Sequence, residues 1–226
     1  MNSVIWDMDG VLLDSEPIYE RVEQAVVSQY GKNIAPIIPQ LLGRTAPTCA
    51  QITVQQLNLP ITPAQYLAQR NAQLLVEMKK VHFLPGVQRT VRHLRQQGVK
   101  QAIATSSPRD LLIAKQHGKQ HFFHLFDALV CGDDVTHGKP DPQIFLSAAR
   151  AIGEAPSNCV VFEDAPAGCK AARLAGMKCV ALPSHHADIK LYQDEDPLLI
   201  VPSACLLDVD LSLLGFPPLP KLDTAE

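Results

Sequence analysis

The 226-residue sequence has no C-x-x-C pair, no apolar run long enough to cross a membrane and no surplus of basic charge. The lack of cysteine pairs favours reduced, mostly buried thiols, as in a cytoplasmic protein, over a disulfide framework. Residues 2–6 are apolar but too few for a signal peptide. The net charge of -3 speaks against a nucleic-acid polymer as a partner. We therefore expect a soluble cytoplasmic protein that does not bind membranes or nucleic acid.

Short apolar runs rich in β-branched residues recur along the chain without strict polar alternation, which is typical of strands buried on both faces. They are Ser3–Trp6, Gln101–Ala104, Ala128–Val130, Cys159–Phe162 and Cys179–Leu182. Helical patterns lie between the later runs, and each ends directly before a glycine, the expected helix stop. These helices are predicted at Val87–Gln97, Pro142–Ile152 and Ala167–Ala175. The alternation predicts an α/β fold with a Rossmann-like parallel sheet flanked by helices.

The stretch from Ser15 to about Phe83 breaks this alternation because it shows helical patterns alone. Its helices are predicted at Ile18–Tyr30, Pro47–Leu57 and Pro63–Lys80. Since the stretch lies between the first and second strands, it is an insertion in the first crossover. We expect residues 1–14 and 84–226 to form an α/β core. Residues 15–83 are expected to form a small α-helical cap over the C-terminal end of the sheet, where open α/β folds bind ligands.

The C-terminal tail holds one more apolar run and then many prolines. Leu198–Val201 is expected to add an edge strand to the sheet. The proline-rich end, Pro202–Pro220, is expected to lie over the surface or to be disordered.

Two aspartates, Asp7 and Asp9, follow directly on the first apolar run and precede Gly10. Alternate residues of a strand face the same way, so the two carboxylates share a direction. Like charges at one sheet edge repel, and a fold avoids them unless a cation or a reaction needs them. An Asp-Gly pair is also ordinary turn chemistry, so this motif alone indicates a turn more often than a catalyst. The strand before it and the sites below reverse that preference.

Paired carboxylates of this kind suit covalent phosphoryl transfer. The first carboxylate attacks phosphorus and forms an aspartyl phosphate, which splits a difficult hydrolysis into two steps. The second protonates the leaving alcohol and then deprotonates the attacking water. A divalent cation is needed to bring an anionic nucleophile onto an anionic phosphate.

Polar residues also follow the second and third predicted strands. Thr105 and Ser106 precede Pro108, and a hydroxyl followed by free backbone amides at a helix start can bind phosphate. Lys139 lies between a glycine and a proline in Gly138–Pro142, where its charge can neutralise phosphoryl oxygens. Taken alone, the hydroxyls are more often a helix cap and the lysine more often a surface residue.

Two adjacent acids, Glu163 and Asp164, end the fourth predicted strand. Mg²⁺ prefers carboxylate and water oxygens, so Asp164 is a natural ligand beside Asp7 and the Asp9 carbonyl. Glu163 either binds the metal directly or orients a ligand. Acids at a helix start are a common alternative explanation. Because all these sites fall at the C-terminal ends of successive strands, the sequence predicts that they form one active site.

This ordered set resembles the haloacid dehalogenase-like superfamily of phosphohydrolases over essentially the whole chain. The matching segments are Asp7–Glu16, Thr105–Ser106, Lys139 and Glu163–Asp164, and the helical insertion resembles the small α-helical cap of the family. The resemblance implies that Asp7 is the nucleophile and Asp9 the acid/base. It implies a phosphate site formed by Thr105, the Ser106 amide and Lys139. It also implies a Mg²⁺ site formed by Asp7, Asp9 and Asp164.

A narrower likeness points to the pseudouridine-5'-phosphatase branch, which implies a nucleoside monophosphate substrate. It rests on His121–Phe123, Gly132–Asp134, His137–Pro142, Phe162–Pro166 and Leu214–Pro217. More broadly, the expected partner is a small soluble phosphate ester, such as a nucleotide or sugar phosphate. Specificity is expected from Arg44, between two cap helices, and from Glu16. A cap this small is compatible with a monomer.

Two alternative functions stay open at this point. β-Phosphoglucomutase-like sugar phosphate mutases share all four motifs, but they usually carry a histidine early in the first cap helix, where this chain has Tyr19. A sensor built on a retired phosphatase scaffold usually loses a nucleophile or a metal ligand, and this chain retains each of them. Haloalkanoate dehalogenases lack the second aspartate, so Asp9 speaks against them.

Overall fold

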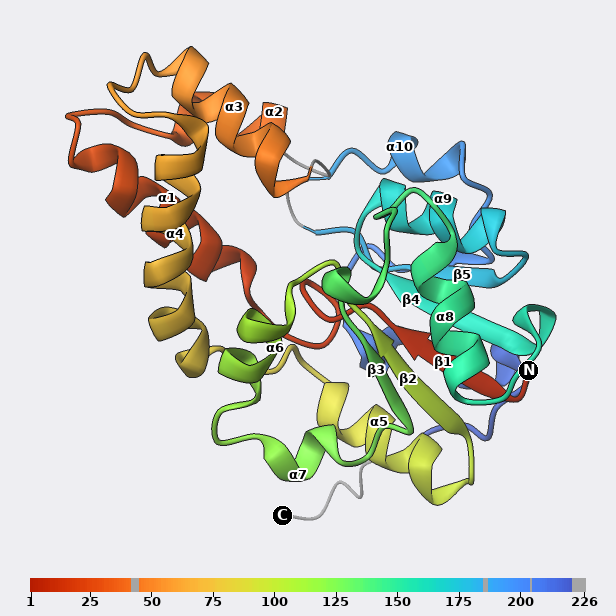
Figure 1. The fold of residues 1–226 in the computed structure, drawn as a ribbon. Helices are drawn as coiled ribbons and strands as arrows, with labels where there is room; N and C mark the ends of the chain where they lie inside the picture. The colour runs from red at the N-terminus through yellow and green to blue at the C-terminus, as the bar shows by residue number, and fades with distance from the viewer. Residues whose placement is uncertain (42–44, 185–186, 204, 221–226) are drawn as a thin grey trace.

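The computed structural model describes residues 1–41, 45–184, 187–203 and 205–220. Its centre is a six-stranded parallel sheet with the strand order β3-β2-β1-β4-β5-β6 (Figure 1). The strands are β1 (Ser3–Trp6), β2 (Lys100–Ala104), β3 (Ala128–Val130), β4 (Cys159–Glu163), β5 (Lys178–Ala181) and β6 (Leu199–Ile200). The predicted α/β fold is confirmed, and each predicted strand end is shifted by no more than one residue.

The strand order creates the place where a ligand site is expected. The chain runs from β1 through β2 to β3 on one side, and then returns to place β4 on the other side of β1. In such sheets the crevice beyond the carboxyl ends of the two strands at the reversal is the usual binding site. Here those strands are β1 and β4, which are followed by Asp7 and Asp164.

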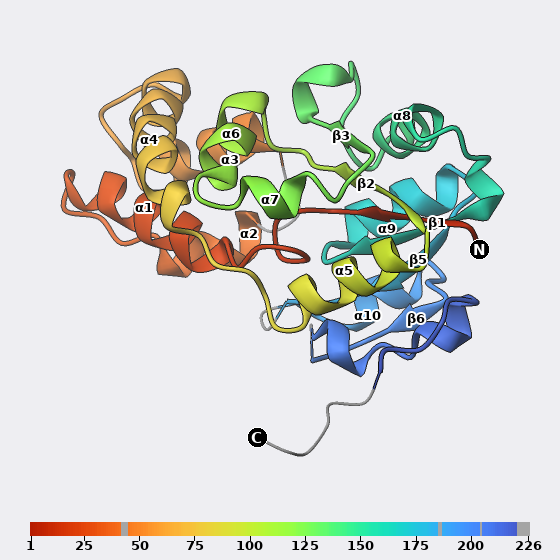
Figure 2. The same ribbon diagram turned by 90° about the horizontal axis from the view of Figure 1, so that it is seen from below.

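Strand alternation divides the core into two layers. Val4 and Trp6 of β1 pack on one face of the sheet, whereas Ile5 packs on the other. The first face is covered by α5 (Val87–Gln96), α6 (Arg109–Gln116) and α7 (Gln120–Phe123). The second is covered by α8 (Gln143–Ala151), α9 (Pro166–Leu174) and α10 (Lys190–Gln193). Figure 2 shows α5 and α8 on opposite sides of the sheet.

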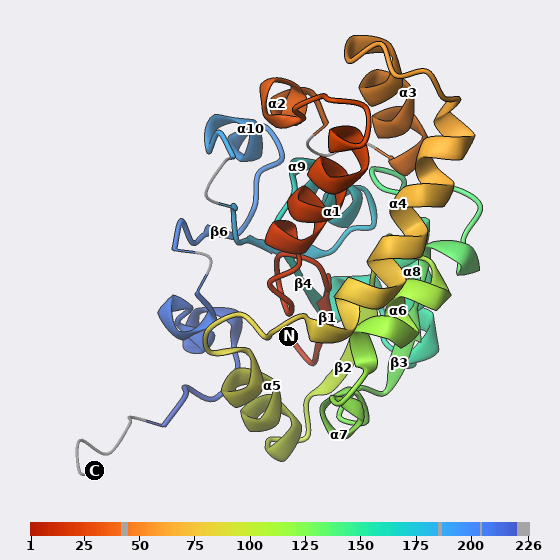
Figure 3. The same ribbon diagram turned by 90° about the vertical axis from the view of Figure 1, so that its left-hand side faces the viewer.

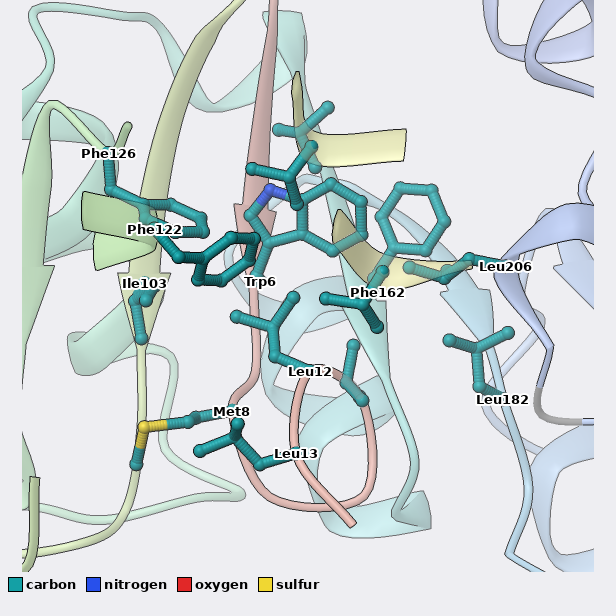
Figure 4. Packing of buried hydrophobic residues seen from close by; sticks show 14 of the residues in the cluster. Trp6, Met8, Leu12, Leu13, Ile103, Phe122, Phe126, Phe162, Leu182 and Leu206 are labelled. Atoms are coloured by element: carbon teal, nitrogen blue, oxygen red, sulfur yellow. The ribbon is translucent and has the colours of Figure 1, made fainter. Parts of the chain in front are cut away.

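Trp6 lies at the centre of the first layer (Figure 4). Its ring stacks on Phe162 of β4, with 4.4 Å between the ring centroids. The buried indole N–H donates to Gln101 Oε1 at 3.0 Å, so the polar end of the side chain is satisfied. Because Trp6 and Phe162 directly precede Asp7 and Glu163, this packing fixes the backbone on which the acidic residues stand.

The helical insertion follows β1 and precedes β2, and it lies beyond the carboxyl end of β1 (Figures 1 and 2). Its helices are α1 (Glu16–Ser28), α2 (Ile38–Leu41), α3 (Ala46–Gln56) and α4 (Pro63–Glu77). Helices α1 and α4 pack on one another, and Figure 3 shows them in front of the sheet. The insertion has its own hydrophobic cluster around Val27 and Tyr66. However, Ile18 and Met78 at its two ends belong to the cluster of the sheet, so the division at residues 15–83 stays a prediction.

The prediction for the tail was wrong beyond β6. Leu206, Leu211, Leu214 and Phe216 are buried and belong to the same hydrophobic cluster as Trp6. Prolines flank this segment at Pro202 and Pro217, and its apolar side chains cover one face of the sheet. The chain also forms 3-10 helices at Ala35–Ile37, Met78–Lys80, Gly132–Asp134, Pro156–Asn158, Leu206–Asp208 and Leu211–Leu214.

Most of the cysteines are buried, as predicted, namely Cys131, Cys159, Cys169 and Cys179. Within the described ranges, none of the helices has the length and apolar character that a membrane crossing requires.

Candidate active site

Asp7 stands at the carboxyl end of β1 and is almost fully buried. Its backbone amide donates to the Phe162 carbonyl of β4 at 2.9 Å. Its carboxylate accepts from Lys139, with 2.5 Å between Nζ and Oδ1. The same ammonium donates to Glu163 Oε1 at 2.6 Å and to the Ala104 carbonyl at 3.2 Å. Lys139 therefore joins the carboxyl ends of β1, β2 and β4 at one point.

This centre has more negative than positive charge. Burial raises the pKa of Asp7 to about 7. The neighbouring charges of Glu163 and Asp9 add to this increase, whereas Lys139 opposes it. Burial also raises the pKa of Asp164, together with the neighbouring charges of Glu163 and Asp7. Burial alone lowers the pKa of Lys139, but the two carboxylates beside it outweigh burial and raise it above its ordinary value. A further cation would relieve the excess negative charge.

Three carboxylates can supply ligands to that cation. Ligand oxygens of Asp7, Glu163 and Asp164 lie within 4.8 Å of one another. Glu163 already accepts from Lys139 and, through Oε2, from the Ala165 amide at 2.9 Å. Across the described ranges, the Asp164 carboxylate receives no hydrogen bond and forms no ion pair. A carboxylate oxygen without a hydrogen-bond donor is available to Mg²⁺, which prefers carboxylate ligands. Asp164, and Asp7 through the oxygen that does not contact Lys139, are therefore better candidates than Glu163.

Two glycines allow these carboxylates to approach the backbone. Gly10 has φ +75°, and a Cβ there would lie 2.2 Å from Asp164 Oδ2. A Cβ at Gly168 would lie 1.9 Å from Glu163 Oε1. Any side chain at either position must displace an acidic group of the site.

Gly10→Ala is therefore expected to weaken Mg²⁺ binding by about 100-fold, because the new methyl group would overlap the Asp164 carboxylate and displace it from its position in the site. The left-handed backbone adds a strain of about 1 kcal/mol. Gly31→Ala is the matched control, since Gly31 has φ +67° and a methyl group added there would have no atom within 4 Å. Calorimetric Mg²⁺ titration of both variants checks the prediction. Equal affinities in the two variants would show that the close approach of Gly10 to Asp164 has no role.

The Asp9 carboxylate belongs to a separate cluster. It accepts from Ser15 Oγ at 2.6 Å and from Ser107 Oγ at 2.8 Å. The Lys115 ammonium lies 2.6 Å from Oδ1 and 2.7 Å from Oδ2 of the same carboxylate. Burial raises the pKa of Asp9, but Lys115 and the hydroxyl donors outweigh it and hold the pKa below its ordinary value. Asp7 and Asp9 are thus each paired with a different lysine.

Lys115 was not predicted from the sequence, although a signal was available. Helix α6 buries Leu111, Leu112, Ala114 and Lys115, which are spaced as one apolar stripe. A lysine in such a stripe requires an acidic partner in the core. Sequence alone does not show which acid, because Asp9 lies 106 positions away.

The segment after β2 holds the predicted phosphate ligands. Thr105 is buried, and its hydroxyl oxygen accepts from the Ser107 amide at 3.1 Å, so its proton remains available to a ligand. Ser106 is exposed. The expectation of free amides at the following helix start is wrong for Arg109, because that amide donates to Asp133 Oδ2 at 2.8 Å.

Glu16 and Arg44 are the two residues predicted to select the substrate. Glu16 is half-buried at the start of α1, and its charge is one of those that raise the pKa of Asp164. Arg44 lies outside the described residues.

An unpredicted contact comes from Tyr192 of α10, whose hydroxyl donates to the Asp164 carbonyl. Tyr192 is buried, and its hydrogen bond holds the backbone of Asp164 in place.

Comparison with known proteins gives consistent findings. The sequence pattern of the haloacid dehalogenase-like hydrolases matches residues 1–176. A protein from Drosophila melanogaster described as a probable pseudouridine-5'-phosphatase is 35% identical over 94% of this chain and 93% of its own length. (DL)-glycerol-3-phosphatase 2 from Arabidopsis thaliana is 32% identical over 95% of this chain and 91% of its own length. A haloacid dehalogenase family hydrolase from Deinococcus radiodurans, solved with bound phosphate and sodium, superimposes with a TM-score of 0.76 at 25% identity, covering 95% of this chain and 96% of that one.

Proposed function

The chain belongs to the haloacid dehalogenase-like hydrolases, and we propose that it is a magnesium-dependent phosphatase that hydrolyses small soluble monophosphates through an aspartyl phosphate on Asp7. The observation that carries the proposal is the buried Asp7 carboxylate at the switch point of the sheet. It is held by Lys139 and lies within 4.8 Å of ligand oxygens of Glu163 and Asp164. Such a carboxylate is fixed in place and close to a cation site, as an anionic nucleophile requires.

In the first step an oxygen of Asp7 attacks phosphorus, and the bond between phosphorus and the ester oxygen breaks. The electron pair of that bond goes to the ester oxygen, which takes a proton from Asp9 and leaves as an alcohol. Asp9 is ionised in the unliganded site, so this proton enters with the bound ester, whose negative charge raises the pKa of Asp9. Lys139, Thr105 and the Ser106 amide hold the phosphoryl oxygens. Lys139 also contacts Asp7 directly, so one ammonium serves both the attacking group and the phosphate.

In the second step a water oxygen attacks the phosphorus of the aspartyl phosphate, and Asp9 takes the proton of that water. The bond between phosphorus and Asp7 breaks, which restores the Asp7 carboxylate and releases inorganic phosphate. Asp7, Asp164 and the Asp9 carbonyl would hold Mg²⁺, which would neutralise charge between the phosphate and the nucleophile. Residues 15–83 act as the cap, which lies over the carboxyl end of the sheet and limits water during the first step.

The substrate class is inferred from the two named relatives, one a probable pseudouridine-5'-phosphatase and the other a glycerol-3-phosphatase. We infer a nucleoside or sugar monophosphate, with pseudouridine 5'-phosphate as the first candidate. Arg44 and Glu16 of the cap are proposed to contact the part of the substrate that leaves.

A screen of phosphate esters with Mg²⁺ tests the proposal. We expect the highest kcat/KM for pseudouridine 5'-phosphate, compared with uridine 5'-phosphate, glycerol 3-phosphate and hexose 1-phosphates. Release of phosphate from none of these esters would contradict the proposed activity. A hexose 1-phosphate with its bisphosphate is the control for a mutase, since formation of the isomer instead of free phosphate would favour that alternative.

A further inference from the structure

Lys115 is a charged residue in the core whose three donor positions are all occupied. Its side chain has no exposed surface. The ammonium contacts the Asp9 carboxylate, donates to Ser107 Oγ at 2.7 Å and donates to Tyr19 Oη at 3.3 Å. A lysine head group with three separate acceptors has a fixed position, and it therefore fixes the carboxylate that it holds.

The Tyr19 contact connects this cluster to the insertion. Tyr19 belongs to α1, and its ring contacts two cations, with Lys115 Nζ 5.5 Å and Arg70 Cζ 5.2 Å from the centroid. Arg70 belongs to α4 and pairs with Glu23 of α1 at 2.8 Å. The position of Tyr19 is thus set by the packing of the two long insertion helices, and Tyr19 in turn supplies an acceptor to Lys115.

The Asp9 carboxylate is turned toward this cluster. Asp9 contributes no ligand oxygen to the acidic group formed by Asp7, Glu163 and Asp164. Instead, its oxygens accept from Ser15, Ser107 and Lys115. The serines are neutral donors, so the Lys115 ammonium is the charged contact that determines which way the carboxylate faces.

We propose that Lys115 is a positioning residue for Asp9, and that Tyr19 completes the Lys115 site from the insertion. The inference rests on the proposed function, in which Asp9 transfers the proton to and from the substrate oxygen. A buried lysine in an apolar stripe is otherwise unfavourable, because replacing a buried ion pair by apolar side chains is often neutral or stabilising. The proposal accounts for its presence, because Lys115 fixes the direction in which the Asp9 carboxyl group faces.

The test compares two leaving groups. An alkyl phosphate needs a proton on its leaving alcohol, whereas p-nitrophenyl phosphate releases a weakly basic phenolate that does not. Because kcat/KM reports the steps through transfer to Asp7, it isolates this requirement from hydrolysis of the intermediate. Lys115→Met is expected to lower kcat/KM for glycerol 3-phosphate by about 100-fold and for p-nitrophenyl phosphate by less than about 5-fold. Asp9→Asn, the reference for a missing acid, is expected to show the same preference.

Lys170→Met is the matched control, since Lys170 is an exposed lysine on α9 and neither kcat/KM value is expected to change. Equal losses for the two substrates in Lys115→Met, or no loss, would overturn the proposal, because a purely structural role does not depend on the leaving group. If Lys115→Met does not fold, Tyr19→Phe decides, with an expected loss of about 3-fold for the alkyl ester alone. An unchanged ratio of the two substrates in that variant also overturns the proposal. A wild type that releases phosphate from neither ester, nor from pseudouridine 5'-phosphate, with Mg²⁺ would refute the proposed function itself, and the inference with it.

Discussion

Asp7→Asn is expected to reduce phosphate release by about 10,000-fold or more, because a neutral amide cannot form the aspartyl phosphate. The reduction should be of the same order for alkyl and aryl esters, because both react by forming the same bond between Asp7 and phosphorus. Steady-state phosphate release in excess Mg²⁺ measures it. Asp194→Asn is the control, because Asp194 is an exposed aspartate on the surface and its removal should leave turnover unchanged. Wild-type turnover in Asp7→Asn would remove Asp7 from the mechanism.

The same substitution is expected to stabilise the protein when Mg²⁺ is absent. Burial and the neighbouring carboxylates raise the pKa of Asp7 from 3.8 to about 7 in the folded state. The folded protein therefore binds this proton more tightly than the unfolded chain, and the free energy of unfolding falls as pH rises from about 4 to above 7. Asparagine has no such loss. In EDTA at pH 8 the melting temperature of Asp7→Asn should exceed that of the wild type, and at pH 4 the difference should disappear. A lower melting temperature at pH 8 would show that the Asp7–Lys139 ion pair stabilises the fold.

Removal of Mg²⁺ by a chelator is expected to reduce turnover by about 1,000-fold, with full recovery when Mg²⁺ is restored. The reason is the excess of buried negative charge around Asp7, which repels a phosphate dianion. Mg²⁺ at 100 times its Kd should also stabilise the folded protein by about 2.7 kcal/mol. Turnover that persists in EDTA after dialysis would exclude a metal-dependent mechanism.

Two isosteric variants test which of Asp164 and Glu163 binds Mg²⁺ directly. Asp164→Asn should weaken Mg²⁺ binding far more than Glu163→Gln, because both oxygens of Glu163 are already used by Lys139 and the Ala165 amide. Thermal shift against Mg²⁺ concentration gives both affinities. The opposite order would make Glu163 the direct ligand.

The sheet was predictable from the sequence for a simple physical reason. Strands such as Val160–Phe162 are buried on both faces, so their composition is constrained at every position and the pattern is visible locally. The acidic residues and Lys139 were identifiable because parallel strands bring their carboxyl ends to one edge whatever the loops do. Their place in the chain was therefore enough to predict that they meet.

Other parts of the site depend on packing that no local pattern reveals. Lys115 contacts Asp9 from the buried face of α6, and Tyr192 contacts Asp164 from the short helix α10. The positions of both helices are set by the rest of the fold. The tail was mispredicted for a related reason. Its prolines dominate the local pattern, whereas burial of Leu211 and Phe216 depends on the open sheet face that they cover.

The pairing of two lysines with two aspartates has a consequence for how such a site changes over evolutionary time. Asp7 and Asp9 are separated by one residue, yet Lys139 arrives from the loop after β3 and Lys115 from a helix that touches the insertion. A mutation near Lys115 alters the environment of Asp9 and leaves the Asp7 contact intact. Substitutions in the insertion can therefore change the surroundings of Asp9 while the contact between Lys139 and Asp7 stays unchanged.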